Sequence, residues 1–249
     1  MFKSFQDTSA LQQFHGFPNL NMQQATSAYG FSGVTFWLDA AYGLNTQTNL
    51  GAVSRWQQRV GEGRFIQDTV SAQMRLVLND SNFNNLPSVE CNAINKWMTA
   101  DNGLRLNISG FTIAVVSKVN TDRQINALLF SLDGSNYMFD GGSGTNRNGF
   151  GFISDSITRL QGSTESLNPR IKIITGTNVI VNGVSETTTG AIGTTSIELK
   201  VLFAQISGAG SATVSYAGTI AEIIAFPYTM TSDEAIALSN NLNQKYAIY

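Results

Sequence analysis

The feature that most limits the fold of this chain is its succession of short β-type runs. These runs, from GVTFWLDA near the start to GTIAEIIAF near the end, are separated by segments rich in Gly, Asn, Asp and Ser. In FTIAVVSKV the odd-numbered residues from Phe111 to Val119 fall on one face and the even-numbered ones from Thr112 to Lys118 on the other, and the first face is the more apolar. Short strands with regular turn signals predict a β-sandwich.

The end of the chain departs from this pattern and predicts an amphipathic helix over about residues 231–247. Thr231 and Glu234 have the spacing of a capping box, in which both side chains pair with backbone N–H groups of the first turn. An apolar residue then recurs every four positions, at Leu238, Leu242 and Tyr246. We therefore expect this helix to pack on the sandwich.

The first residues carry Gln, Ser and Asn without any strand period. We interpret residues 1–32 as an N-terminal arm that precedes one domain over residues 33–249. Burying a Phe side chain is worth about 1.5 to 3 kcal/mol, so exposed phenylalanines would be a liability. We expect those of the arm to bind a partner: Phe2, Phe5, Phe14 and Phe17.

Composition argues against several classes of partner and of site. Charged residues are 13% of the chain, against roughly 25% in ordinary soluble proteins, and the net charge is -2 with the basic residues scattered. This predicts neither nucleic-acid binding nor membrane association. The single cysteine, Cys91, is predicted to be a buried, inert thiol. The N-terminus lacks the apolar stretch of a signal peptide.

Several segments in order resemble the concanavalin A-like lectin and glucanase superfamily, specifically its laminin-G-like jelly rolls. They are VTFWLDAAYGLN, VSRWQQRVGEG, RLVLNDSNFNNLPSVE, FTIAVVSKV, VNGV and GTIAEIIAFPYTMTSDEAIALSNNLNQKYAIY, within about residues 33–249. The resemblance implies an all-β fold: a two-sheet antiparallel jelly-roll sandwich with the terminal helix packed against it. Members often continue the PSV strand into Phe-Asp-Gly, whereas this chain has Glu90, Cys91 and Asn92.

The sequence shows none of the familiar catalytic patterns. Some enzymes of this superfamily present carboxylates as E-x-D-x-x-E on one strand, and a retaining glycosidase needs its two carboxyl groups about 5 to 5.5 Å apart. Here Glu222 stands alone in its strand, so we expect it to tie that strand to a neighbouring loop or helix end. The only histidine, His15, lies in the arm, and no ligand spacing fits zinc. We predict no catalytic residues, no metal and no cofactor.

The segment SLDGSNYMFDGGSGTNRNGFGFISD contains the candidate ligand-binding residues. It lacks the G-K-[ST] ending of a phosphate-binding loop. Asp133, Asp140 and Asn146 could hold calcium, although Asp-Gly pairs are ordinary turns, and both interpretations stay open. A sugar site would combine an aromatic face with placed polar groups, drawn from Tyr137, Asp140, Asn146, Arg147 and Phe150.

These observations predict a noncatalytic structural or attachment protein of a bacteriophage particle, either a capsid decoration or a fibre-associated protein. Its partners would be capsid or other virion proteins contacted through the arm, and glycans, and it would be a homo-oligomer located in the virion. The alternative is a free carbohydrate-binding module or an extracellular adhesin. A divergent glycoside hydrolase is the third hypothesis.

Overall fold

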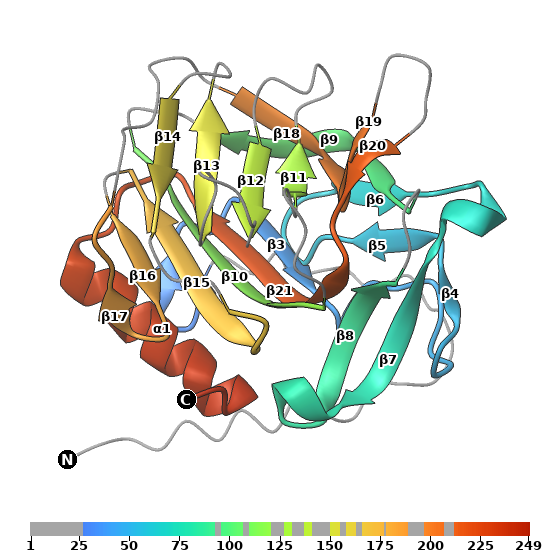
Figure 1. Ribbon diagram of the computed structural model, residues 1–249, viewed down its shortest axis with the longest axis horizontal. Coiled ribbons are helices and arrows are strands. Elements are labelled where there is room, and N and C mark those ends of the chain that lie inside the picture. The colour runs from blue at the N-terminus through green and yellow to red at the C-terminus, as the bar shows by residue number, and fades with distance from the viewer. Residues whose placement is uncertain are drawn as a thin grey trace.

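A computed structural model describes residues 27–249 apart from ten internal gaps. The gaps are residues 93–95, 107–109, 121–126, 131–136, 141–149, 155–157, 163–165, 177, 189–196 and 207–211. Within the described part, two large antiparallel sheets face each other and one α-helix covers the outer face of one sheet (Figure 1). The predicted all-β sandwich with a C-terminal helix is confirmed, and the arrangement is that of a jelly roll.

The first sheet has nine strands in the described residues, ordered β17-β16-β15-β10-β21-β8-β7-β4, with β3 paired to β21. Their bounds are β3 (Phe36–Asp39), β4 (Ala52–Val53), β7 (Met74–Asp80), β8 (Leu86–Cys91), β10 (Thr112–Val119), β15 (Arg170–Thr175), β16 (Val179–Val181), β17 (Val184–Ser185) and β21 (Gly218–Phe226). Strand β21 is buried along its whole length and lies at the centre of the sheet.

The second sheet has eight strands in the described residues, ordered β14-β13-β12-β11-β18-β9-β6-β5. Their bounds are β5 (Arg55–Gln57), β6 (Arg64–Ile66), β9 (Met98–Leu106), β11 (Ala127–Phe130), β12 (Tyr137–Asp140), β13 (Phe150–Ser154), β14 (Thr158–Gln161) and β18 (Ile197–Leu202). The remaining elements are the hairpins β1 (Ser27–Ala28) with β2 (Phe31–Ser32) and β19 (Ala204–Ile206) with β20 (Ala212–Ser215), the short 3-10 turns η2 (Val70–Ala72) and η3 (Ser81–Phe83), and the helix α1 (Ser232–Tyr246).

Strand β10 contributes to two separate apolar cores, and the face predicted to be the more apolar lies in the one between the sheets. Phe111, just before the strand, with Ile113 and Val115 in it, belongs to the core between the two sheets. Ala114 and Val116 belong to a second core, between the nine-stranded sheet and α1. The face with the larger side chains therefore forms the centre of the sandwich, and the other face receives the helix.

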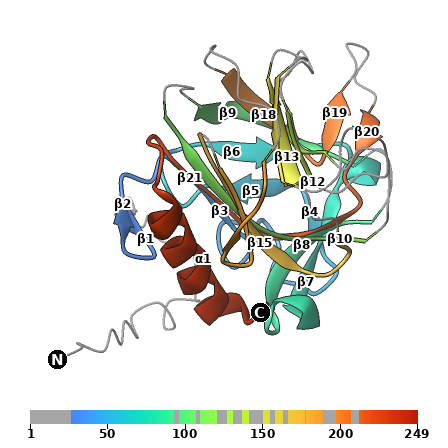
Figure 2. The same cartoon turned by 60° about the vertical axis from the view of Figure 1, so that its left-hand side comes forward.

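Helix α1 begins and packs as predicted. The Thr231 hydroxyl accepts a hydrogen bond from the Glu234 backbone N–H, and the Glu234 carboxylate accepts one from the Thr231 N–H, which completes the capping box. The helix lies along the outside of the nine-stranded sheet (Figure 2). Its buried apolar residues are Ala235, Leu238, Leu242 and Tyr246.

The boundary between arm and domain lies earlier than residue 33. Hairpin β1–β2 packs on the domain, because Ala28 is buried in the helix-side core and the Tyr29 carbonyl accepts a hydrogen bond from Asn241 of α1. Residues 27–32 of the predicted arm thus belong to the folded unit. The four phenylalanines of the arm, Phe2, Phe5, Phe14 and Phe17, lie outside the described residues.

Candidate functional site

Glu222 lies on the helix side of β21 and is buried, with 1% of its side chain exposed. Its carboxylate binds the hairpin, a neighbouring strand and the helix at once. The four donors are Tyr29 Oη (2.8 Å), Trp37 Nε1 (2.6 Å), Lys245 Nζ (3.0 Å) and Tyr246 Oη (2.6 Å). The prediction that Glu222 ties its strand to a loop and a helix end is confirmed.

A second carboxylate, Asp39 of β3, lies beside Glu222 in the register of the sheet. Lys245 Nζ bridges the pair, 3.2 Å from Asp39 Oδ2 and 3.0 Å from Glu222 Oε2. Burial and the nearby Asp39 charge raise the pKa of Glu222. Burial by itself would lower the pKa of Lys245, but the charges of Glu222 and Asp39 outweigh it, so the pKa of Lys245 is raised. Two paired carboxylates could suggest hydrolytic chemistry. Both are at most 2% exposed beneath α1, so this cluster joins helix to sheet and offers a substrate no access.

A second buried cluster lies between the two sheets and is built around Asp140, at the end of β12. Asp140 Oδ1 accepts a hydrogen bond from Arg170 Nη2 at 2.7 Å, and Asp140 Oδ2 accepts one from Lys172 Nζ. Lys172 Nζ also donates to Ser117 Oγ of β10 at 2.6 Å. Burial lowers the pKa of Lys172 to about 8, against the opposing effect of Asp140. The cluster holds the first residue of β15, Arg170, in a fixed position.

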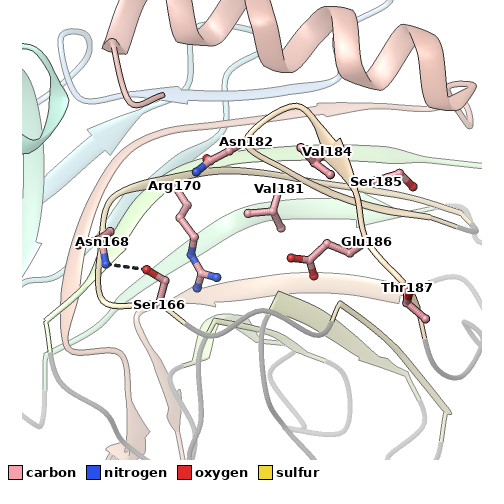
Figure 3. A pocket seen from close by; sticks show the side chains of 9 residues that line it. All are labelled: Ser166, Asn168, Arg170, Val181, Asn182, Val184, Ser185, Glu186 and Thr187. Atoms are coloured by element: carbon pink, nitrogen blue, oxygen red, sulfur yellow. Dashed lines mark hydrogen bonds between the residues drawn. The ribbon is translucent and has the colours of Figure 1, made fainter.

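Arg170 lines a pocket of about 460 Å³ at the β17 edge of the nine-stranded sheet (Figure 3). The segment leading into β15 forms one wall, and the β16–β17 hairpin with the residues after it forms the other. The hairpin turns at Asn182 and Gly183, which both have positive φ, as a type I′ turn requires. The lining residues are Ser166, Asn168, Arg170, Val181, Asn182, Val184, Ser185, Glu186 and Thr187.

Burial increases from the rim of this pocket to its floor. Arg170 and Val181 are 2% and 7% exposed, whereas Val184 is 65% exposed and Leu167, beside the lining Ser166 and Asn168, is 50% exposed. Figure 3 shows the Arg170 guanidinium and the Glu186 carboxylate reaching into the same space, with Val181 between them. The pocket thus places a cation, an anion and an apolar surface around one volume.

Glu186 spans the gap between the two sheets. Its backbone N–H donates to the Val179 carbonyl in the nine-stranded sheet. Its carboxylate lies against Gly162, directly after β14 of the other sheet, so closely that a Cβ at residue 162 would be 1.9 Å from Glu186 Oε2. Because Gly162 has no side chain, it leaves room for the Glu186 carboxylate at this position.

The candidate sugar residues predicted from the sequence lie at different places. Tyr137 and Asp140 are in β12 and are 8% and 0% exposed, and the Asp140 carboxylate already binds Arg170, Lys172 and Ser117. Phe150 begins β13, opposite Asp140. Asn146 and Arg147 lie outside the described residues, as does Asp133 of the possible calcium site.

The pocket residues were not predicted, because serines, asparagines and a glutamate near turns are common in any β-sandwich. One signal was available: Arg170 and Lys172 are two charges at alternate positions of the otherwise apolar run RIKIIT, so both point to the same face. Charges on the core-facing side of a strand require partners there.

Among the described residues, no three His, Cys, Asp or Glu side chains are grouped to hold a metal ion. In the same part of the chain, no helix has the length and apolar character that crossing a membrane requires.

Comparison with known proteins supports the fold. No family model matches the sequence, and no curated protein matches it significantly. Domain 4 of AbnA, a GH43 extracellular arabinanase from Geobacillus stearothermophilus solved in complex with arabinotriose, is similar with a TM-score of 0.57 at 12% identity, over 83% of this chain and 98% of that one. Trypanosoma rangeli sialidase in complex with 2,3-difluoro-KDN is similar with a TM-score of 0.51 at 13% identity; the match covers 89% of this chain but 35% of the sialidase. At these identities the likeness shows a shared β-sandwich fold.

Proposed function

We propose that this protein is a noncatalytic carbohydrate-binding β-sandwich and that the pocket over Arg170 is its sugar site. The observation that carries this proposal is the convergence of Arg170, Glu186 and Val181 on one volume at the sheet edge. Sugars present hydroxyl groups and C–H faces together, and small-molecule sites combine apolar surface with a few placed polar groups. Carboxylate acceptors and guanidinium donors both bind hydroxyl groups.

The preorganisation of Arg170 supports binding in particular. Asp140 binds the guanidinium from the interior and is itself held by Lys172, which also donates to Ser117, so little side-chain entropy remains to be lost when a ligand is bound. Domain 4 of the arabinanase, which has a similar fold, was solved with arabinotriose, which supports a carbohydrate ligand by analogy alone.

The noncatalytic part of the proposal rests on the positions of the carboxylates. Asp39 and Glu222 are paired but covered by α1, and Asp140 is held between two cations. Glu186 is the one carboxylate among the described residues that line the pocket, whereas glycoside hydrolysis ordinarily uses two.

A glycan array with the labelled full chain tests the proposal. We expect binding to a defined subset of glycans, weakened at least tenfold by Glu186→Gln and unchanged by Glu62→Gln, an exposed carboxylate between β5 and β6 that does not line the pocket. Absence of binding to every glycan, or equal loss in both variants, would refute the site. Release of reducing sugar from a bound glycan would refute the noncatalytic assignment.

We propose further, from the sequence of the arm, that the domain is a virion component attached through Phe2, Phe5, Phe14 and Phe17. Deletion of residues 1–26 is expected to abolish co-purification with phage particles and to leave the thermal transition of the domain unchanged. Recovery of the truncated chain with particles would contradict the attachment, and loss of the thermal transition would show that the arm belongs to the core of its own chain.

A further inference from the structure

The buried cluster around Asp140 brings a lysine amine and a carboxyl group together from opposite sheets. Asp140 is the last residue of β12 in the eight-stranded sheet, and Lys172 lies in β15 of the nine-stranded sheet. Lys172 Nζ donates a hydrogen bond to Asp140 Oδ2, the oxygen bonded directly to the carboxyl carbon Cγ. Both side chains are 0% exposed. The fold therefore holds a nucleophilic atom beside an acyl carbon, away from solvent.

The surroundings of this pair are apolar. Val115 lies opposite Lys172 in the register of β10 and β15, and Val115 and Ile174 both belong to the core between the sheets. Burial is the largest influence on Lys172 and lowers its pKa to about 8, although the Asp140 charge opposes this. An exposed lysine has a pKa of about 10.4, so Lys172 reaches its neutral amine form more readily near neutral pH. The neutral amine is the form that attacks a carbonyl carbon.

Ser117 of β10 connects the two reacting groups. Its Oγ accepts a hydrogen bond from Lys172 Nζ at 2.6 Å and donates one to Asp140 Oδ2 at 3.4 Å. When an amine attacks a carboxyl group, the nitrogen must lose a proton and one carboxyl oxygen must gain it before leaving. A hydroxyl group placed between these two atoms is positioned to relay that proton.

Arg170 contacts the other oxygen of the same carboxyl group. Its Nη2 donates to Asp140 Oδ1 at 2.7 Å, and its side chain is 3% exposed. Negative charge develops on this oxygen when Cγ becomes tetrahedral, and a fixed donor in a buried site stabilises such charge. The four side chains thus provide a nucleophile, an acyl carbon, a proton relay and a donor for the oxyanion.

We propose that Lys172 Nζ and Asp140 Cγ join in an amide bond that cross-links the two sheets, with Ser117 as the proton relay and Arg170 as the oxyanion donor.

The step needs no reactant besides these side chains, and the ion pair described above is its starting state. A proton passes from Lys172 Nζ to the Asp140 carboxylate, which gives an amine and a carboxylic acid. The Nζ lone pair then forms a bond to Cγ, and the electrons of the C=O bond move onto Oδ1. One Nζ proton passes through Ser117 to Oδ2, the Cγ–Oδ2 bond breaks and water leaves, while the Oδ1 electrons re-form the C=O bond.

The product fits the same site. Its carbonyl oxygen still accepts from Arg170, and its N–H still faces the Ser117 hydroxyl. Forming the amide removes two buried charges, and burying charges is costly, so the apolar surroundings favour the neutral product. Since Cys91 is the only cysteine, an intrachain disulfide cannot link the two sheets, and the amide would supply a covalent link that reducing agents leave intact.

Mass spectrometry of the intact, denatured full chain tests the proposal. We expect the wild-type protein to be lighter than its sequence by one molecule of water. Proteolysis followed by fragmentation should yield a branched peptide in which the segment containing Asp140 is joined to the segment containing Lys172.

Three variants assign the bond to these atoms. Lys172→Met removes the amine and leaves Asp140 paired with Arg170, and it should have its full sequence mass. Lys200→Met is the matched control, because Lys200 is a partly exposed lysine of β18 paired with Glu198, and it should still lack one water. Ser117→Ala should form the cross-link more slowly by about tenfold or more when the mass is followed after a short pulse of synthesis.

Each contrary result has a definite meaning. A folded wild-type protein that keeps its full sequence mass would overturn the proposal, and so would a loss of water that persists in Lys172→Met or maps to other residues. Cross-linking of Ser117→Ala at the wild-type rate would overturn the relay. None of these outcomes depends on whether the pocket over Arg170 binds a sugar.

Discussion

Replacing Glu222 by Gln should destabilise the fold strongly, because this carboxylate joins four elements of the structure. It accepts hydrogen bonds from β1–β2, β3 and α1 while buried at 1% exposure. The amide of Gln has one acceptor oxygen and one NH₂ group, so whichever way it is turned its NH₂ faces Trp37 Nε1 or the donors on the other oxygen. The variant keeps the volume and removes the charge.

The magnitude follows from the partners. Breaking a buried ion pair by removing one partner costs about 3 to 5 kcal/mol, and Lys245 here keeps Asp39 as a second carboxylate, which favours the lower part of that range. A chain of 150 to 250 residues loses about 2 to 4 °C of melting temperature per kcal/mol, so a cost of about 3 kcal/mol corresponds to a decrease of about 6 to 12 °C.

Urea unfolding followed by circular dichroism measures this change directly. The matched control is Glu62→Gln, the same substitution at an exposed carboxylate, which should change the free energy of unfolding by less than about 0.5 kcal/mol. A loss below about 1 kcal/mol for Glu222→Gln would refute the reasoning that the carboxylate holds the helix and hairpin on the sheet.

Three further predictions concern the buried ion pairs of Asp140, the cap of helix α1 and the tyrosines with raised pKa. Asp140→Asn leaves the Arg170 and Lys172 charges buried without their carboxylate and should lower the free energy of unfolding in urea by about 3 to 5 kcal/mol. Adding Lys172→Met should restore part of that loss. An Asp140→Asn variant as stable as the wild type would contradict this reasoning. Thr231→Ala removes the helix cap and should cost about 0.5 to 2 kcal/mol, with unchanged stability as the contrary result. Burial raises the pKa of Tyr29, Tyr216 and Tyr246, so above pH 10 tyrosines ionise in the unfolded chain while these stay protonated in the fold. The free energy of unfolding should therefore fall as the pH rises above 10, by up to about 1.4 kcal/mol per pH unit for each of these three tyrosines. If the absorbance of the folded protein at 295 nm showed all seven tyrosines ionising near pH 10, this prediction would be contradicted.

The sequence was most informative where structure depends on near neighbours in the chain. The alternation in β10 predicted its more apolar face, which lies in the core between the sheets, and the spacing of Thr231 and Glu234 predicted the start of α1. Both patterns follow from local backbone geometry, in which side chains repeat every two residues in a strand and about every 3.6 in a helix.

The two buried polar clusters, one around Glu222 and one around Asp140, depend on pairing between distant segments of the chain. They were therefore only partly predictable from the sequence. Glu222 could be assigned to architecture because no acidic partner lies near it in sequence, but its neighbour Asp39 comes from β3 and is placed by strand pairing. The sugar site predicted in the loop after β12 included Asp140, whose carboxylate instead fixes Arg170 from inside. Sequence spacing does not indicate which side of a sandwich an end-of-strand carboxylate faces.

The central claim is that one pocket binds a sugar without cleaving it, and the most direct measurement is mapping of amide chemical shifts during titration with the tightest-binding sugar from the glycan array. The account predicts shifts confined to the residues around Ser166–Arg170 and Val181–Thr187, with the sugar spectrum unchanged over days. Shifts centred elsewhere, for example on the loops beside β12 and β13, or signals of a hydrolysed glycosidic bond when an oligosaccharide is used, would contradict it.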